Sequence, residues 1–305
     1  MSLQQNPRER LRAITTMLGA VGSFAVMDAL LKRLASHYGP MQLAFLRCIS
    51  SLVFVLGAVQ WKGIWASVRP ANPWLHLVRG VLGTLMLGGF VYAVRRLNLA
   101  QTYSLFLCAP LLMTALSVPL YGDRVPLRRW LAIAVGLSGV LIILQPWGAG
   151  FGSLAGTAAA ALACICYALS ASAVRTLGRR NTSLSMVLWF LVLAGCGSGL
   201  ASLSDWRTLV RSDWIWFVAV GVSGSLGQLW LTDAFRRAPA SVVGPFEYTA
   251  ILWAFAIDWF FWSATPSASL IVGAAIVIAS GVYIILDERR LAELELALAP
   301  GSPPP

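Results

Sequence analysis

Apolar runs of about 20 residues, separated by short polar breaks, recur along the whole chain. A helix of that length crosses the ~30 Å hydrocarbon core of a bilayer, because it rises ~1.5 Å per residue. The runs leave little room for charge: 11% of the residues are charged and 58% are hydrophobic, whereas roughly 25% are charged in soluble domains. The runs are therefore predicted to be membrane spans.

Ten such spans follow one another along the sequence. They fall near Ile14–Leu31, Met41–Val59, Leu75–Val94, Ala100–Tyr121, Trp130–Gln145, Leu154–Arg175, Leu184–Leu203, Trp214–Asp233, Ser241–Trp262 and Ser269–Leu286. Stretches such as Val135–Leu144 show no alternation of polar and apolar residues, which a transmembrane β-strand would require. The sequence therefore predicts an all-α, multi-pass integral membrane protein with ten transmembrane helices.

Basic residues lie mainly in the breaks between spans, which accounts for the net charge of +11 without a nucleic-acid partner. If the N-terminus is cytoplasmic, the breaks on that side hold fifteen of the 23 Lys and Arg residues, against six on the opposite side. Arg47 and Arg79 are the two that remain inside spans. The positive-inside rule then places both the N- and the C-terminus in the cytoplasm.

The second five spans resemble the first five. Gly139 in the fifth span corresponds to Gly281 in the tenth, and Arg95, after the third span, corresponds to Arg236 after the eighth. Because five is odd, two copies of a five-helix unit would enter the membrane from opposite sides. Inverted repeats of this kind are typical of secondary transporters, although two apolar halves can also look alike by composition alone.

Short sequence motifs are spread along nearly the whole chain. They are Pro40, Arg47, Arg79-Gly80, Ala100-Gln101-Thr102-Tyr103, Pro110-Leu111-Leu112 and Gly122-Asp123-Arg124 in the first half, and Pro245-Phe246-Glu247, Gly273 and Gly281-Val282 in the second. In this set the chain resembles the drug/metabolite transporter superfamily, specifically its ten-helix EamA-like branch. Within that branch it is most similar to the YddG-like exporters of aromatic and other amino acids.

This resemblance implies a domain organisation and a function. Residues 1–145 and 146–286 would be two EamA-like five-helix repeats, and residues 287–305 a cytoplasmic tail. The protein would be a secondary transporter of the cytoplasmic (inner) membrane that exports amino acids, aromatic and other neutral ones favoured, or related small metabolites by alternating access. A carrier of nucleoside-type metabolites such as S-adenosylmethionine is the alternative, and a membrane-embedded enzyme is a more distant one.

Ionisable residues inside spans are candidates for the site, because a charge at the centre of a membrane helix costs roughly 2.5–3.5 kcal/mol on insertion scales. Arg47 can bind a substrate carboxylate through its two-pronged guanidinium, or it can form a structural ion pair with Asp28 on the first span. Arg79 and Asp233 lie near span ends, where we expect coupling or structural ion pairs. Asp258 is expected to be structural.

Glu247 lies well inside the ninth span and is the best candidate to bind a substrate ammonium or a proton, with a hydrogen-bonded structural glutamate as the alternative. Pro110 and Pro245 interrupt the fourth and ninth spans, and such interruptions mark transporter sites or simple kinks. The remaining substrate-binding candidates are side chains that supply aromatic walls and neutral hydrogen bonds, namely Tyr103, Tyr167, Gln228, Trp230 and Tyr248.

Missing motifs bear on catalysis. Lys32 and Lys62 are the only lysines, so the sequence contains no Walker-type nucleotide-binding loop. His37 and His76 are the only histidines, and no clustered metal-ligand motif occurs. We therefore expect no catalytic residues, no metal and no cofactor. The expected partners are a small-molecule substrate and membrane lipid, with the chain either a monomer or a homodimer through small-residue packing motifs.

Overall fold

The computed structural model describes residues 7–122, 125–144, 153–178, 180–237 and 244–297. Every regular element in these ranges is helical, so the predicted all-α class is confirmed. The helices are α1 (Pro7–Leu34), α2 (Pro40–Lys62), α3 (Pro73–Arg96), α4 (Leu99–Phe106), α5 (Ala109–Tyr121), α6 (Leu127–Leu144), α7 (Leu154–Leu177), α8 (Ser183–Ser202), α9 (Trp214–Arg237), α11 (Ala250–Trp262) and α12 (Ala268–Ala297). Short 3₁₀ turns occur at η1 (Trp65–Val68), η2 (Leu203–Asp205), η3 (Arg211–Asp213) and η4 (Gly244–Thr249).

Six helical segments in the described ranges are long and apolar enough to cross a membrane. They are Leu11–Leu34, Pro40–Trp61, Pro73–Arg96, Leu154–Val174, Ser183–Asp205 and Arg211–Ala234, and two shorter apolar segments are Leu99–Met113 and Ala268–Ile284. Large apolar side chains also cover the outside of the bundle, with Trp61 88% exposed. A surface of this kind is compatible with lipid, and the molecule is a multi-pass membrane protein. The count of ten spans stays a prediction.

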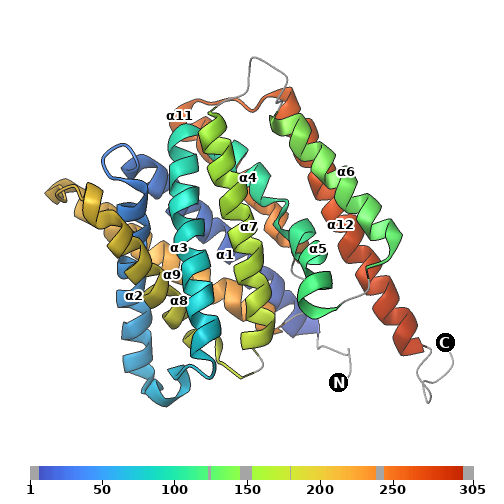
Figure 1. Cartoon of the computed structure of the whole chain (residues 1–305), viewed down its shortest axis with the longest axis horizontal. Helices are drawn as coiled ribbons and strands as arrows, with labels where there is room; N and C mark the ends of the chain where they lie inside the picture. The colour runs from blue at the N-terminus through green and yellow to red at the C-terminus, as the bar shows by residue number, and fades with distance from the viewer. Residues whose placement is uncertain (1–6, 123–124, 145–152, 179, 238–243, 298–305) are drawn as a thin grey trace.

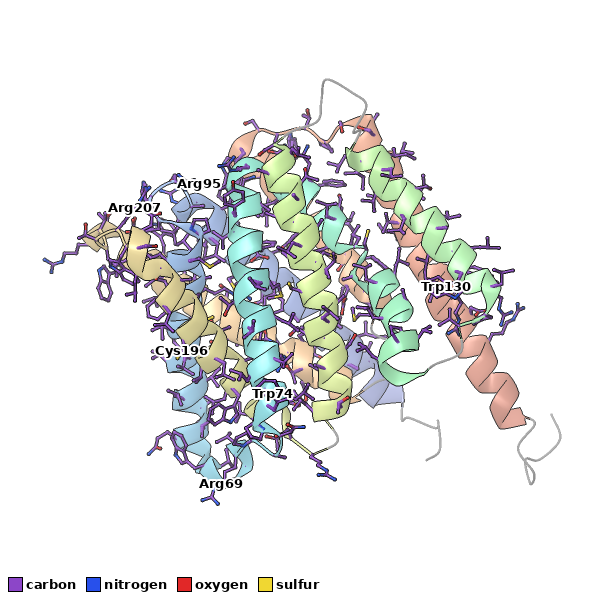
Figure 2. All side chains as sticks on the ribbon, viewed as in Figure 1. Arg69, Trp74, Arg95, Trp130, Cys196 and Arg207 are labelled. Carbon is purple, nitrogen blue, oxygen red and sulfur yellow. The ribbon has the colours of Figure 1, made fainter. Side chains whose placement is uncertain are left out.

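Arginine and tryptophan side chains mark the ends of the helices (Figure 2). Arg95 and Arg207 lie at one end of the bundle and Arg69 at the other, while Trp74 and Trp130 project outward. Both tryptophans are exposed. This distribution matches the aromatic and basic residues that flank the hydrocarbon core in membrane proteins.

The helix boundaries follow from local sequence signals. Pro73 opens α3 directly after Asn72, whose side-chain oxygen accepts a hydrogen bond from the Leu75 amide at 3.3 Å. This is a standard N-terminal cap, and proline is tolerated next to it because the first amides of a helix have no helical acceptor. Gly63 ends α2 with φ of 63°, a left-handed conformation that glycine adopts without steric cost.

The fourth and ninth predicted spans are both interrupted. In the fourth, α4 ends at Phe106 and α5 begins at Ala109, so Pro110 lies in the first turn of a new helix, where a missing amide costs little. In the ninth, the 3₁₀ turn η4 precedes α11. Each interruption lies beside the centre of the bundle, where unwound backbone is tolerated when it borders protein or a cavity.

The helices pack in pairs that each take one helix from either half of the chain. Helix α1 packs along α9, α3 along α7, α2 along α8, and α6 along α12. By order along the chain, α1, α2, α3 and α6 of the first half correspond to α7, α8, α9 and α12 of the second. Exchanging each helix for its counterpart turns the α1–α9 pair into the α7–α3 pair. The same exchange leaves the α2–α8 and α6–α12 pairs unchanged. The α2–α9 and α3–α8 contacts are exchanged in the same way.

Helices α6 and α12 form a pair on one flank of the bundle (Figure 1). They cross at two glycines: a Cβ added to Gly139 would lie 2.8 Å from the Gly273 carbonyl oxygen, so only glycine fits at this crossing. The Ser280 hydroxyl on α12 donates a hydrogen bond to the Ala132 carbonyl on α6. Close backbone contact and interhelical hydrogen bonds are the main ways in which membrane helices associate.

Candidate functional site

A cavity of about 230 Å³ lies between the two halves of the chain. Its walls come from α1, α2, α3, α4, α7, α8, α9, η4 and α11. Four charged side chains border it, which are Asp28, Arg47, Arg79 and Glu247. Seven aromatic side chains complete most of the wall: Phe24, Phe90, Tyr103, Phe106, Tyr167, Phe190 and Tyr248.

Asp28 reaches the cavity from the last third of α1. One carboxylate oxygen, Oδ2, accepts a hydrogen bond from the Tyr103 hydroxyl on α4 at 2.5 Å. The other oxygen, Oδ1, is buried and has no hydrogen-bond partner in the structure. Asp28 is 6% exposed, so little water from outside the protein reaches this carboxylate.

Arg47 approaches Asp28 from α2, and the two charges interact electrostatically. The predicted ion pair is nevertheless not a direct contact, because no N–O distance between these two described residues falls within 4.0 Å. The Asp28 oxygen on the α4 side is instead bonded to Tyr103. Arg47 forms no hydrogen bond with another described residue, and its half-buried guanidinium borders the cavity.

Arg79 is held by the protein more firmly than Arg47. Its Nη1 donates a hydrogen bond to the Met186 carbonyl on α8 at 2.8 Å, and its guanidinium lies 5.0 Å from the centre of the Phe190 ring. Its Nε is buried and has no hydrogen-bond partner among the described residues. These contacts join α3 to α8, whereas no ion pair links Arg79 to another described residue, so its predicted ion-pair role stays a prediction.

Glu247 enters the cavity from η4, in the interrupted part of the ninth span. No hydrogen bond or ion pair joins it to any described residue. Its charge acts on the neighbouring Tyr167 and Tyr248, and Arg79 also acts on Tyr167. Tyr248 is buried and its hydroxyl has no hydrogen-bond partner among the described residues.

The charged groups thus form two clusters in one cavity. In the first, Asp28 lies near Arg47 and is hydrogen-bonded to Tyr103 on α4; in the second, Glu247 and Arg79 both lie within electrostatic range of Tyr167. Each cluster contains one acidic and one basic side chain. The walls between the clusters are largely aromatic and apolar, with Gln228 as a neutral polar group.

Two predicted site residues, Trp230 and Asp233, lie elsewhere. Trp230 packs against α1, where its Cε3 lies 3.1 Å from the position of a Cβ on Gly19. Asp233 lies on α9 beyond the cavity-lining residues Gln228 and Leu231. The side chain of Pro110 falls outside the described residues.

Sequence reasoning missed most of the aromatic wall. Phe90, Phe106 and Phe190 line the cavity, but a phenylalanine in an apolar helix carries no signal that separates a cavity from lipid or core. Phe90 and Phe106 meet edge to face, with ring centres 5.5 Å apart, and Phe106 also contacts Tyr167. The rings therefore form one continuous surface.

A second contact that sequence reasoning missed lies at the end of the bundle beside the α1–α2 loop. Lys32 at the end of α1 forms a 2.6 Å ion pair with Asp258 on α11; the Asp258 side chain is buried and that of Lys32 is partly buried. The second oxygen of Asp258 accepts a hydrogen bond from the Ala100 amide at the start of α4 at 2.8 Å. Lys32 also lies over the Trp262 ring at 4.2 Å. Three helices from both halves are thereby joined above the cavity.

Comparison with known proteins gives the family. The EamA-like transporter family matches the chain twice, over residues 11–145 and again over residues 154–286. The chain belongs to the EamA-like transporter family. The match covers both halves, and these ranges fall within the two units that the sequence predicts as repeats.

Characterised relatives of this EamA-like protein are transporters of small metabolites. The pseudopaline exporter CntI of Pseudomonas aeruginosa is 29% identical over 264 residues, covering 86% of this chain and 92% of the exporter. The riboflavin transporter of Vibrio cholerae is 26% identical over 305 residues, 98% of this chain and 100% of that protein. The S-adenosylmethionine uptake transporter of Rickettsia prowazekii is 22% identical over 280 residues, 92% and 94% of the two chains.

A solved crystal structure has the same fold as this EamA-like chain. It matches with a TM-score of 0.66 at 20% identity and covers 92% of this chain and 98% of the other. The relatives and the family together make this chain a small-metabolite transporter. None of the three relatives is named as an amino-acid exporter, so the narrower resemblance to YddG-like exporters is unsupported by these names.

Proposed function

We propose that this EamA-like transporter is a secondary carrier that exports amino acids or related zwitterionic metabolites with an aromatic or apolar body. The proposal rests on one observation. Arg47 and Glu247, of opposite charge, border the same cavity, and neither forms a hydrogen bond or ion pair with a described residue. Buried or half-buried charges without a partner are costly in a membrane protein, so such groups are expected to bind a ligand.

Arg47 supplies the anion-binding part of the proposed site. A guanidinium presents parallel N–H donors that match the two oxygens of a carboxylate, and such charge-assisted pairs are stronger than neutral hydrogen bonds. Glu247 supplies an acceptor for an ammonium or another donor group of the solute. Asp28 lies beside Arg47 with one oxygen unpartnered, so a carboxylate and an adjacent amine can both be satisfied at this cluster.

The aromatic wall sets the body of the proposed solute. Phe90, Phe106 and Tyr167 form a continuous surface on which an aromatic or flat heterocyclic group can stack. The same surface favours the alternative substrate, a nucleoside-type zwitterion such as S-adenosylmethionine, because two characterised relatives are named for that compound and for riboflavin. Aromatic amino acids and S-adenosylmethionine both carry flat rings.

Alternating access follows if the two halves are inverted repeats, which we propose on two grounds. The family matches each half separately, and the helix contacts are preserved when the halves are exchanged. In such carriers one half rocks against the other around a site at the midplane. If both termini lie in the cytoplasm, the end of the bundle at which Lys32 pairs with Asp258 faces the outside of the cell.

Export is the proposed direction. The relative named as an exporter is 29% identical, whereas the one named for uptake is 22% identical. The direction of transport is tested with purified protein inserted in liposomes in a known orientation. Efflux and uptake of the labelled solute are compared under solute gradients of equal size.

Counterflow tests the substrate class. Proteoliposomes loaded with an unlabelled amino acid should take up the labelled one transiently, and tryptophan, leucine, glutamate, lysine, S-adenosylmethionine and riboflavin serve as competitors. Saturable exchange of a zwitterion with an apolar or aromatic body supports the proposal. Exchange of riboflavin but of no zwitterion contradicts the assigned roles of Arg47 and Glu247.

Two variants and two matched controls locate the site. Arg47→Gln and Glu247→Gln should each raise the half-saturating concentration at least tenfold, because a hydrogen bond to a charged group contributes about 1.5–3 kcal/mol. Arg95→Gln and Asp205→Asn change exposed residues outside the cavity and should leave exchange unchanged. If the site variants and the control variants changed exchange equally, the assignment of Arg47 and Glu247 to the substrate site would be contradicted.

A further inference from the structure

The Asp28 carboxylate has an unusual environment for a buried charge. It lies at the wall of the cavity, 6% exposed, with Oδ2 hydrogen-bonded to Tyr103 and Oδ1 buried without a partner. An ionised carboxylate in an apolar setting must be compensated by a cation, by hydrogen bonds or by taking up a proton. One hydrogen bond and an arginine that is close but not in contact compensate it only in part.

Among the described residues, no cationic side chain is in direct contact with the Asp28 carboxylate. Arg47 on α2 and Tyr103 on α4 act on it directly, and Asp258 on α11 acts on Tyr103. The other polar groups that face the cavity come from α3, α7, α9 and η4, and are Arg79, Tyr167, Ser170, Gln228, Glu247 and Tyr248. Arg79 is the only cation in this set of described cavity-lining residues, and it is already hydrogen-bonded to the Met186 carbonyl on α8.

We propose that Asp28 is a proton-binding site, and that a proton and the amine of the substrate compete for its free oxygen, so that export of the solute is coupled to entry of a proton. This inference rests on the proposed function. With Asp28 ionised, an ammonium is held between Asp28 and the aromatic wall while its carboxylate pairs with Arg47. When Oδ1 takes a proton, a new O–H bond neutralises Asp28, and the ammonium loses its counter-ion and leaves.

The geometry also connects this proton to the end of the bundle where Lys32 and Asp258 form their ion pair. Asp28 lies one helical turn from Lys32 on α1, and Tyr103 lies one turn from Ala100 on α4. The Asp28–Tyr103 bond and the Lys32–Asp258–Ala100 contacts are therefore adjacent layers of the same helix interface. A protonated acid accepts a weaker hydrogen bond than a carboxylate does, so proton binding weakens the layer next to this ion pair.

A pH gradient across proteoliposomes tests the inference. Vesicles that are acid inside should accumulate labelled substrate above its outside concentration as protons leave, and an ionophore that exchanges protons for potassium should abolish this accumulation. An inward or outward sodium gradient at equal pH should have no effect. If the wild type shows counterflow but does not respond to the pH gradient, the proton inference is refuted while the proposed function stands. If it shows no counterflow with any solute, the proposed function itself fails.

Asp28 variants assign the effect. Asp28→Asn removes the titratable oxygen and should abolish gradient-driven accumulation, whereas Asp28→Glu keeps a carboxylate and should retain it. Asp205→Asn, an exposed carboxylate outside the cavity, is the matched control. Accumulation by Asp28→Asn equal to that of the wild type would overturn the assignment.

A binding measurement covers the case in which Asp28→Asn no longer transports. Competition with one proton makes the apparent Kd of the wild type rise about tenfold for each pH unit below the titration of the site. Substrate binding in weakly buffered detergent solution should also release protons. The Asp28→Glu variant should show the same release. Proton release that is absent from the wild type, or unchanged in Asp28→Asn, contradicts the inference.

Discussion

Removing Lys32 should destabilise the fold strongly, because its partner Asp258 would remain buried without a cation. In the ion pair, Lys32 is 10% exposed and Asp258 is 3% exposed, and the two atoms are 2.6 Å apart. Breaking such a pair from one side typically costs 3–5 kcal/mol. Asp258 keeps its hydrogen bond from the Ala100 amide, so we expect the lower end of that range, about 3 kcal/mol, for Lys32→Met.

The buried thiols of the protein provide the assay. Cys48, Cys108, Cys164 and Cys166 are free and buried, so a thiol-reactive dye becomes fluorescent as the detergent-solubilised protein unfolds. At roughly 2 °C for each kcal/mol in a chain of this size, Tm should fall by about 6 °C. Arg33→Met is the matched control: Arg33 is exposed over the Trp216 ring, a contact of about 0.5–1 kcal/mol.

A double mutant separates the pair from general damage. Lys32→Met with Asp258→Asn removes both charges, so the double variant should be more stable than the sum of the two single effects predicts. A shift below 1 °C for Lys32→Met, or strict additivity of the two changes, would refute the interpretation that these residues form a buried, coupled pair.

Three further outcomes are expected from other contacts. Gly139→Ala should lower stability by about 1–3 kcal/mol, since its Cβ would lie 2.8 Å from the Gly273 carbonyl oxygen; thermal unfolding that equals the wild type would contradict the tight crossing. Asn72→Ala should cost about 1 kcal/mol through loss of the cap on α3, and Asn72→Asp should restore most of it. Phe106→Ala should weaken binding of aromatic solutes more than that of leucine, as measured by competition in counterflow, because it removes a stacking ring.

Much of the fold could be predicted from the sequence, since run length and hydropathy are direct consequences of the bilayer. The first span is predicted to end near Leu31, and α1 continues to Leu34 and carries Lys32 on its last turn. The sequence counts Lys32 among the basic residues between spans, since it follows Leu31. A charge at a helix end is tolerated when a buried partner such as Asp258 is available, and a partner 226 residues away leaves no local signal.

The site was harder to predict than the fold, because a cavity depends on which face of each helix points inward. Gln228 and Trp230 were grouped together, but residues two apart on a helix point in different directions, and only Gln228 borders the cavity. The charged candidates were easier, since a charge in an apolar helix is costly and must point toward the interior. Asp28 shows the limit of that reasoning: its nearest hydrogen-bond partner is Tyr103 rather than the predicted Arg47.

The measurement that tests the central claim most directly compares an amino acid with its carboxamide in counterflow. If Arg47 binds the carboxylate, the wild type should exchange the acid with a half-saturating concentration at least tenfold lower than that of the amide. Arg47→Gln should lose that preference, with the amide affected little, while Arg95→Gln keeps it. An Arg47→Gln variant that still prefers the acid as strongly as the wild type would contradict the account of this cavity as the substrate site.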